Sequence, residues 1–413
     1  MRRKIATTAS SIVRGAYHLI LMVLSIALIC FTLVTIIFVT YFFCIIKNHK
    51  KRDYLHVINE AMNRTLTNDE LPKISILIPA YNEEKAIETK LKDVAAMQYP
   101  HSKREVVLID DCSTDNTVLI AKRAFRELNL HGKIVRNNER TGPNGCYNRG
   151  LQESTGDLIA TTDADVMVDH DALLKSVKIL DTLRDVGGLF ARMMPISTAN
   201  TAAVNIEGPY RKLWDGMFVA ESAIHSTFPG YTNFTLVRRS AFPTMRLDYG
   251  SSDANISFAV IRKGLRYVCI PTILFYEPVA ESLREQVRQK TRRAARIIQA
   301  ARANKDMLLS SKYGAFGKLI FPLRLLLLIS PVLSFLGCVA LLIAVAYVSI
   351  YWVLAMPLFL LVTYAGNRLG LSKLSLFWAL IVHQCYLLIG LLLCFRKRGV
   401  WRPVERSSII GAN

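Results

Sequence analysis

Acidic and aromatic residues follow three short apolar runs of the chain, "ISILIPA", "EVVLI" and "DLIATT". The polar residues at the ends of these runs are Tyr81 and Glu83, Asp110 and Asp111, and Asp163 and Asp165. Carboxylates gathered at one place repel one another unless a cation or a hydrogen-bonding ligand lies between them. The set therefore predicts a binding site for a cation together with a polar ligand.

The pair Asp163 and Asp165 is separated by one residue, so both carboxylates of a turn can face one divalent ion. Mg²⁺ or Mn²⁺ held there would bridge the phosphates of a ligand and stabilise a departing diphosphate. We predict that Asp111, with Tyr81 and Glu83 beside it, accepts hydrogen bonds from the base or ribose of a nucleotide.

Asp253 stands at the start of a helix predicted over residues 254–264 and has two interpretations. It either caps that helix together with Ser251 and Ser252, or it is a general base that deprotonates an attacking hydroxyl. We expect the base, because the helix and the strand after it would hold Asp253 against the sheet. A metal-assisted displacement with one base predicts inversion at the carbon that is attacked.

A basic helix is predicted over residues 281–305. Arg292 and Arg293 on it could reach a diphosphate, since guanidinium groups pair well with phosphate oxygens. A solvated or membrane-facing charged helix is the alternative, and different arginines could serve each role.

These residues need a sheet that brings strand ends together. Apolar strands alternate with helices between about residues 72 and 318, which predicts an α/β domain with a mostly parallel sheet covered on both faces. In such sheets ligands bind at the carboxyl ends of the strands. All three acidic motifs lie at that edge.

Long apolar segments flank this region in a chain of 413 residues with 52% hydrophobic residues. Residues 16–46 exceed the roughly 20 needed to cross a bilayer, and they lack the short core and small-residue cleavage site of a signal peptide. Residues 324–366 fit two spans and residues 374–395 a third. We therefore expect a multi-pass protein of the cell membrane with a cytoplasmic polar domain.

The formal net charge of +20 suits phosphate-bearing ligands or an anionic membrane surface. Because the basic residues lie beside the apolar segments, they favour lipid headgroups, and we expect no nucleic-acid partner. A basic tail favours a cytoplasmic carboxyl terminus, whereas one plus three spans place it outside, so its side stays open. Eight scattered cysteines without a CxxC pair indicate reduced, buried thiols.

The ordered motifs "PAYNEE", "DDCSTDNT", "TDAD", Asp253 and "QKTRR" resemble the family 2 inverting glycosyltransferases with a GT-A catalytic domain, which include cellulose, chitin, hyaluronan and poly-N-acetylglucosamine synthases. The resemblance covers roughly residues 74–330. It implies a Rossmann-like nucleotide-sugar-binding domain in which Asp111 contacts the nucleotide. It also implies that Asp163 and Asp165 contact diphosphate and metal, that Asp253 is the base, and that Gln289–Arg293 takes the place of QxxRW.

Three positions depart from the family pattern. Ser252 replaces the usual Glu before the catalytic Asp, Arg293 replaces the Trp of QxxRW, and Pro143 replaces a Lys for which Arg140 or Arg149 could substitute. The loss of that Trp leaves processive polymer synthesis and single-sugar transfer to a polyprenyl phosphate or glycolipid both open. A non-catalytic receptor or scaffold with a degenerate nucleotide-binding domain is the alternative of another class.

The predicted organisation has three parts. Residues 1–50 form an anchor helix, residues 51–311 a cytoplasmic glycosyltransferase domain with the basic helix at its interface, and residues 312–413 a region of about three membrane helices with a basic tail. The expected partners are a nucleotide-sugar donor such as a UDP-sugar, a lipid or glycan acceptor, Mg²⁺ or Mn²⁺, and membrane lipids. The oligomeric state stays open.

Overall fold

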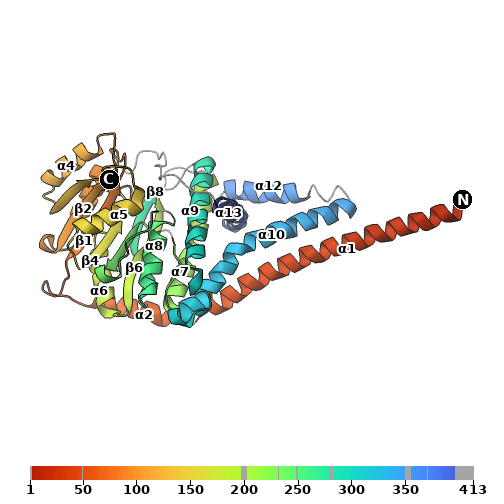
Figure 1. The fold of residues 1–413 in the computed structure, drawn as a ribbon, viewed down its shortest axis with the longest axis horizontal. Helices are drawn as coiled ribbons and strands as arrows, with labels where there is room; N and C mark the ends of the chain where they lie inside the picture. The colour runs from red at the N-terminus through yellow and green to blue at the C-terminus, as the bar shows by residue number, and fades with distance from the viewer. Residues whose placement is uncertain are drawn as a thin grey trace.

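The computed structural model shows an α/β domain joined to a group of long helices (Figure 1). Helix α9 (Leu283–Ala303) stands between the domain and helices α12 (Ala355–Arg368) and α13 (Ser372–Leu393). The structure describes residues 2–48, 50–196, 202–230, 232–247, 250–278, 282–348, 355–369 and 371–395. The predicted basic tail lies outside these residues.

An eight-stranded sheet in the order β3-β2-β1-β4-β7-β6-β8-β5 forms the centre of the domain. Its strands are β1 (Ile74–Ala80), β2 (Arg104–Asp110), β3 (Gly132–Arg136), β4 (Leu158–Thr162), β5 (Met167–Val168), β6 (Val186–Ile196), β7 (Phe234–Arg238) and β8 (Arg266–Pro278). Strand β1 pairs in parallel with both β2 and β4. The chain runs outward from β1 to β3 and then returns to place β4 on the other side of β1. This switch point leaves a crevice at the carboxyl ends of β1 and β4.

The sheet is mixed, which corrects the prediction of a mostly parallel one. Strands β3, β2, β1 and β4 are parallel, but β7 runs antiparallel to both β4 and β6, and β5 runs antiparallel to β8. The apolar pattern of β7 predicts a buried strand without specifying its direction. Its direction follows from contacts with its neighbours, including a 2.7 Å hydrogen bond between the hydroxyls of Thr161 and Thr235.

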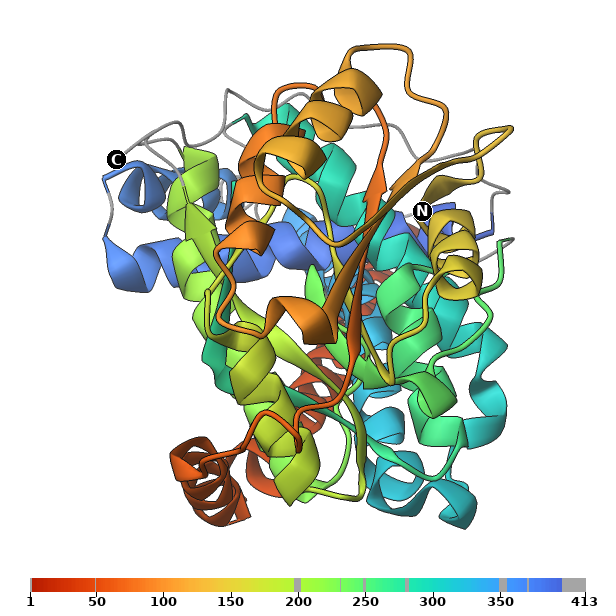
Figure 2. The ribbon, with the colours of Figure 1, turned by 90° about the vertical axis from the view of Figure 1, so that its left-hand side faces the viewer.

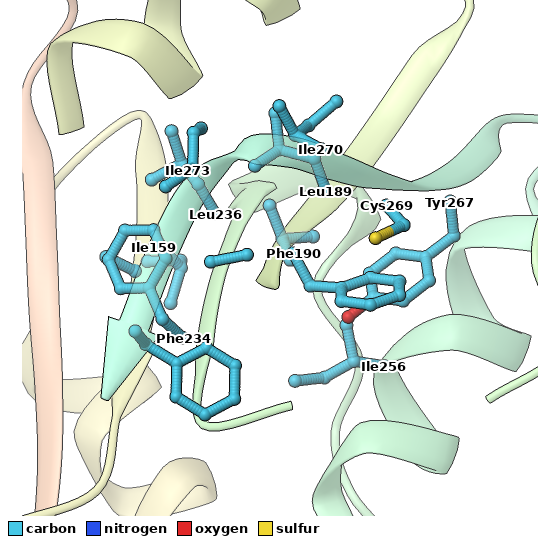
Figure 3. Packing of buried hydrophobic residues seen from close by; sticks show 14 of the residues in the cluster. Ile159, Leu189, Phe190, Phe234, Leu236, Ile256, Tyr267, Cys269, Ile270 and Ile273 are labelled. Atoms are coloured by element: carbon cyan, nitrogen blue, oxygen red, sulfur yellow. The ribbon is translucent and has the colours of Figure 1, made fainter. Parts of the chain in front are cut away.

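The core forms where β-branched and aromatic side chains of the strands meet the covering helices (Figure 3). Ile159, Leu236 and Phe234 are completely buried on the neighbouring strands β4 and β7. The rings of Phe190 and Tyr267 stack with their centroids 5.4 Å apart. The sheet is thus held as a rigid support for the loops at its edge.

Helices pack against both faces of the sheet, as Figure 2 shows with the domain toward the viewer. They are α2 (Lys50–Asn63), α3 (Ile87–Ala95), α4 (Thr117–Glu127), α5 (Gly142–Glu153), α6 (Ala172–Thr182), α7 (Ala202–Ile224) and α8 (Ser252–Arg262). Helix α9 begins with a serine cap, since the Ser282 hydroxyl accepts a 3.2 Å hydrogen bond from the amide of Glu285, three residues on.

Two helical segments, Arg14–Ile46 and Phe316–Val348, are long and apolar enough to cross a membrane. Arg14–Ile46 includes most of α1 (Arg2–Tyr41) and the π-helical turn Phe42–Ile46, and Phe316–Val348 consists of the π-helical turn Phe316–Ile320 and α10 (Phe321–Val348). Helices α1 and α10 pack side by side in Figure 1. Of the predicted span over residues 374–395, residues 374–393 belong to α13, whose strongly apolar segment Trp378–Leu393 is shorter than these two segments. Residues 324–366, predicted as two spans, cover most of α10 and α12, of which α10 alone is long enough among the described residues.

A buried ion pair joins these long helices to the domain. Glu221 of α7 is completely buried, and its Oε1 accepts hydrogen bonds from Arg324 Nε of α10 at 2.5 Å and from the Tyr41 hydroxyl of α1 at 2.7 Å. Its Oε2 accepts from the Thr227 hydroxyl at 2.8 Å and from the Phe228 amide at 3.0 Å. One carboxylate therefore connects three helices to the segment that leads into β7.

Candidate active site

A cavity of about 130 Å³ opens at the carboxyl ends of β1 and β4, at the switch point of the sheet. It brings together eight of the residues that the sequence singles out for chemistry, Asp253 among them, and it adds others. Its polar and charged lining consists of Tyr81, Glu83, Asp111, Cys146, Asp163, Asp165, Thr232, Asn233, Ser251, Ser252, Asp253, Glu277, Arg292, Arg293 and Arg296. Acidic groups from the ends of four strands, β1, β2, β4 and β8, and basic groups from one helix thus face the same space.

The loop after β1 places Tyr81 at one wall of this cavity. The Asn82 amide donates to the Ser113 hydroxyl at 3.0 Å, and the Thr114 amide donates to Asn82 Oδ1 at 2.9 Å, so this loop is fastened to the one after β2. Asn82 has a φ of 54°, which asparagine tolerates better than most residues. The guanidinium of Arg140 lies 3.5 Å from the centre of the Tyr81 ring. Arg140 thereby lies against the ring of Tyr81, which lines the cavity.

Asp111 lies at the next wall and is held by backbone and side-chain donors. Its Oδ1 accepts from the Thr141 amide at 2.8 Å and from Asn137 Nδ2 at 3.0 Å, and its Oδ2 accepts from the Gly142 amide at 2.8 Å. Burial alone would raise the pKa of Asp111, but these hydrogen bonds outweigh it and hold the pKa below its ordinary value. Asp111 is therefore ionised, and it orders the loop at the start of α5.

Asp163 and Asp165 follow β4 directly and both line the cavity. The hydroxyl of the buried Tyr147 lies 3.5 Å from Asp163 Oδ1 and supports that carboxylate from α5. Mg²⁺ and Mn²⁺ prefer oxygen ligands, and magnesium is often held by one or two carboxylates together with substrate phosphates and water. The pair fits this donor set, although within the described residues no cluster of three or more His, Cys, Asp or Glu forms a closed metal site.

Asp253 lies in the first turn of α8 and is not the cap of that helix. The cap is Ser251, whose hydroxyl accepts from the Ala254 amide at 3.4 Å, so the alternative of Asp253 as N-cap is not what the geometry shows. Burial raises the pKa of Asp253 to about 7; a hydrogen bond from Thr232 and the charge of Arg293 oppose this shift, and Glu277 adds to it. A carboxylate poised near neutral pH inside a cavity has the property required of a general base.

We predict that activity depends on pH through Asp253. With a pKa of about 7, the base is ionised above that value, so kcat/KM is expected to fall about tenfold per pH unit below it and to level off above it. The Thr232 hydroxyl donates to Asp253 Oδ1 at 3.0 Å and stabilises the ionised form. Thr232→Val should therefore shift the pH at which kcat/KM begins to fall to a value about one to two pH units higher, because it removes a hydrogen bond to a charged group. If kcat/KM falls at the same pH in both proteins, Asp253 is not the group that causes the fall.

Helix α9 forms the basic wall. Arg292, Arg293 and Arg296 all line the cavity. Arg293 Nη2 donates to Oε1 of the buried Glu277 at 2.9 Å, which fixes one guanidinium beside Asp253. Glu277, Arg296 and Cys146 are site residues that sequence reasoning missed. A buried acid at the end of β8 opposite an Arg-rich helix is the signal that could have identified Glu277.

Two predicted ligand residues do not line the cavity. Asp110 is completely buried; its Oδ2 pairs with Arg136 Nε at 3.1 Å and its Oδ1 accepts from the Ser113 amide at 3.1 Å, because the end of a strand sends Asp110 and Asp111 to different sides. Gln289 is buried on α9. Of the two proposed substitutes for the missing Lys, Arg140 lies beside Tyr81 and Asp111, whereas Arg149 pairs with Glu153 at 2.9 Å.

An α/β domain with a mixed sheet, an acid-rich crevice at its switch point and an opposing arginine wall defines a nucleotide-binding domain of the GT-A-like type. The family model described as "Glycosyl transferase family 2" matches residues 75–242, so the chain carries a family 2 glycosyltransferase domain. This confirms the resemblance drawn from the motifs and the enzyme class that it implies.

The named relatives agree with this family. The Bacillus subtilis (strain 168) "Probable glycosyltransferase YdaM" is 28% identical over 237 residues, or 54% of each chain. The beta-monoglucosyldiacylglycerol synthase of Nostoc sp. is 37% identical over 110 residues, 26% of this chain and 24% of that protein. The chain thus spans about half the length of the first of these relatives and about a quarter of the second.

A solved structure shares the fold over most of its length. The Pyrobaculum calidifontis mannosyltransferase PcManGT, in complex with GDP-Man and Mn²⁺, superimposes with a TM-score of 0.68 at 23% identity. The match covers 89% of this chain and 98% of that one. The GT-A-like arrangement of the domain is therefore shared with a known enzyme.

Proposed function

We propose that the protein is a membrane-bound inverting glycosyltransferase that moves a sugar from a nucleotide-diphosphate sugar to a lipid or growing glycan. One observation carries the proposal. The carboxylates of Asp163, Asp165 and Asp253 and the guanidinium groups of α9 face one cavity at the switch point of the sheet. This combination supplies a diphosphate-binding wall and a proton acceptor in the same space.

The donor would lie across the cavity from β1 to α9. Tyr81 and Arg140 offer a stacking surface for the base, and the loop that Asp111 orders borders the ribose. Asp163 and Asp165 would hold Mg²⁺ or Mn²⁺, which neutralises charge on the diphosphate when bound. Arg292 and Arg293 would contact the phosphate oxygens. GDP-Man and Mn²⁺ in the structural neighbour support a nucleotide sugar and a divalent ion, while the identity of the base and sugar is left to experiment.

The acceptor would approach Asp253 from the side opposite the leaving group. The raised pKa of Asp253 suits a base that takes the proton of the acceptor hydroxyl as the new bond forms. Because no second carboxylate is needed as a nucleophile, this single displacement inverts the anomeric carbon. The Glu277–Arg293 ion pair holds a positive charge beside Asp253 and keeps the cavity from being uniformly acidic.

The apolar helices support attachment to a membrane. Arg14–Ile46 and Phe316–Val348 would span the bilayer, with α12 and α13 completing a multi-pass region after residue 311 and residues 51–311 forming a cytoplasmic catalytic domain. Both a processive synthase and a single-sugar lipid transferase agree with this organisation. Sizing of the radiolabelled product from membranes supplied with a panel of nucleotide sugars separates the two, and no sugar transfer from any donor would reject the proposal.

We predict that Arg292→Ala impairs turnover more than folding. Loss of one charge-assisted hydrogen bond to a phosphate costs about 1.5–3 kcal/mol, which corresponds to a fall in kcat/KM of roughly tenfold to hundredfold. Arg288 lies on the same helix, is exposed and does not line the cavity, so Arg288→Ala is the matched control. Steady-state kinetics and melting temperatures of both variants test this. Equal kinetics for the two would assign Arg292 to a solvated helix face.

A further inference from the structure

A buried ion pair on α3 lies beside the segment that follows the acid pair Asp163 and Asp165. Lys90 is 1% exposed and Asp93 is 3% exposed, and Lys90 Nζ lies 3.1 Å from Asp93 Oδ2. Neither residue lines the active-site cavity. Taking two charges out of water is costly, and apolar residues of similar volume often stabilise a fold as well or better. The pair therefore indicates that its polar contacts fix the geometry of a neighbouring segment.

These contacts are with the backbone of β5 and of the residue before it. Lys90 Nζ donates to the Val166 carbonyl at 2.8 Å. Asp93 accepts from the Val168 amide, at 3.3 Å to Oδ2 and 3.4 Å to Oδ1. Backbone groups of residues two apart in a strand face the same side, so the ion pair binds one edge of this segment at two points.

The opposite edge of the same segment pairs with β8 in an antiparallel register. The Asp169 amide, one residue beyond β5, donates to the Leu274 carbonyl at 3.1 Å, so the alternate backbone groups face β8. Strand β5 is the last in the order of the sheet, and its outer edge would otherwise present an unpaired carbonyl and amide. Lys90 and Asp93 supply these partners in place of a further strand.

The two carboxylates of the acid pair are thus held by different parts of the structure. Asp163 directly follows β4, an inner strand, and the Tyr147 hydroxyl of α5 supports its carboxylate. Asp165 directly precedes Val166, whose carbonyl is bound to Lys90. Only one residue separates the two acids, so a displacement of Val166 moves Asp165 relative to Asp163.

We infer that Lys90 and Asp93 are positioning residues of the acid pair, which fix the segment after Asp165 so that both carboxylates face one divalent ion. The inference rests on the proposed function, because it concerns the ion that Asp163 and Asp165 would hold. Replacement of residues that orient metal ligands commonly weakens metal binding by about tenfold to hundredfold. Since neither residue lines the cavity, their loss should change the metal concentration required and leave the rate at saturating metal nearly as it is.

The double variant Lys90→Met/Asp93→Leu tests the inference, because it removes both charges and keeps apolar side chains of similar volume. In the full chain in detergent, electron paramagnetic resonance should show a Kd for Mn²⁺ alone that is about tenfold or more above wild type. Hydrogen exchange without metal should show the Val168 amide exchanging about tenfold or more faster, with the central strands unchanged. At saturating Mn²⁺, kcat should stay within about threefold of wild type.

Lys92→Met/Glu88→Leu is the matched control on the same helix. Lys92 and Glu88 form an exposed ion pair at 2.8 Å, so the same chemical changes there should leave Mn²⁺ binding as in wild type. A milder variant, Lys90→Met/Asp93→Asn, keeps an amide oxygen that can accept from Val168. It should fold even where the first variant does not, and it should weaken Mn²⁺ binding by about threefold to tenfold, because one hydrogen bond to the segment is lost.

The outcomes separate this inference from the proposed function. Equal Mn²⁺ affinity in wild type and in every Lys90 variant that folds would mean that the pair serves stability alone, whatever the melting temperatures, and would overturn the inference. An unchanged exchange rate of the Val168 amide would overturn it as well. Absence of Mn²⁺ binding in the wild-type protein would instead overturn the metal role in the proposed function, and the inference with it.

Discussion

Asp253→Asn is expected to lower kcat by about 10²–10⁴-fold, the usual contribution of a positioned general base. The amide keeps the shape of the side chain and can still accept the hydrogen bond from Thr232, but it cannot take up a proton. Because Ser251 caps α8, the helix should keep its start, and donor affinity should stay within about twofold of wild type. Rapid-quench measurement of transfer and calorimetric titration of the donor separate chemistry from binding.

Asp171→Asn provides a matched control for this substitution. Asp171 precedes α6 on the surface, makes no capping hydrogen bond and pairs with Lys175 at 2.7 Å, so the same chemical change there should leave the rate as it is. Near-normal transfer by Asp253→Asn would remove Asp253 from the mechanism. The nearest acid in the sequence, Asp248, lies outside the described residues, so its substitution would be the next test.

Chelation of divalent ions is expected to lower transfer by about a thousandfold or more, since a bound ion supplies several kcal/mol of charge stabilisation to the leaving diphosphate. Added Mn²⁺ or Mg²⁺ should restore it. Asp163→Asn and Asp165→Asn should each raise the metal concentration needed for half-maximal activity, because each removes one of two carboxylates from the cavity.

A control for Asp163 and Asp165 lies at the other end of β4. Asp157 precedes β4 and its Oδ2 accepts from the Lys73 amide at 3.0 Å, far from the cavity, so Asp157→Asn should keep the metal dependence of wild type. Full transfer in excess chelator would reject the metal role of Asp163 and Asp165. Direct Mn²⁺ binding, followed by electron paramagnetic resonance, gives a readout that does not depend on turnover.

The parts of the fold that could be predicted are those in which local pattern and long-range packing agree. Strands β1, β2 and β4 are short β-branched runs that end in polar residues, and they form the parallel half of the sheet. The direction of β7 and the pairing of the two-residue β5 with β8 depend on contacts between segments far apart in the chain. The residue pattern within a single strand does not predict such contacts.

The same distinction applies to the cavity. Asp163 and Asp165 are recognisable in the sequence because they form an acidic pair directly after an apolar strand, and Asp253 because it stands at the start of a helix pattern. The raised pKa of Asp253 comes from burial and from Thr232, Arg293 and Glu277, which only the folded chain brings near it. Asp110 and Asp111 are adjacent acids with equal sequence signals, yet one pairs with Arg136 and the other borders the cavity. Which of the two carboxylates reaches the cavity depends on the direction of each side chain at the end of β2.

The Glu221 carboxylate also bears on how the protein is assembled during synthesis. Chains fold from the amino terminus as they emerge, so α7 with Glu221 is made about 100 residues before Arg324 of α10. Until α10 arrives, the carboxylate lacks the cation that offsets its burial, and removing one partner of such a pair costs about 3–5 kcal/mol. Completion of the α/β domain is thereby coupled to synthesis of the helix that follows it, and we expect a fragment released before that helix to be a target for cellular quality control.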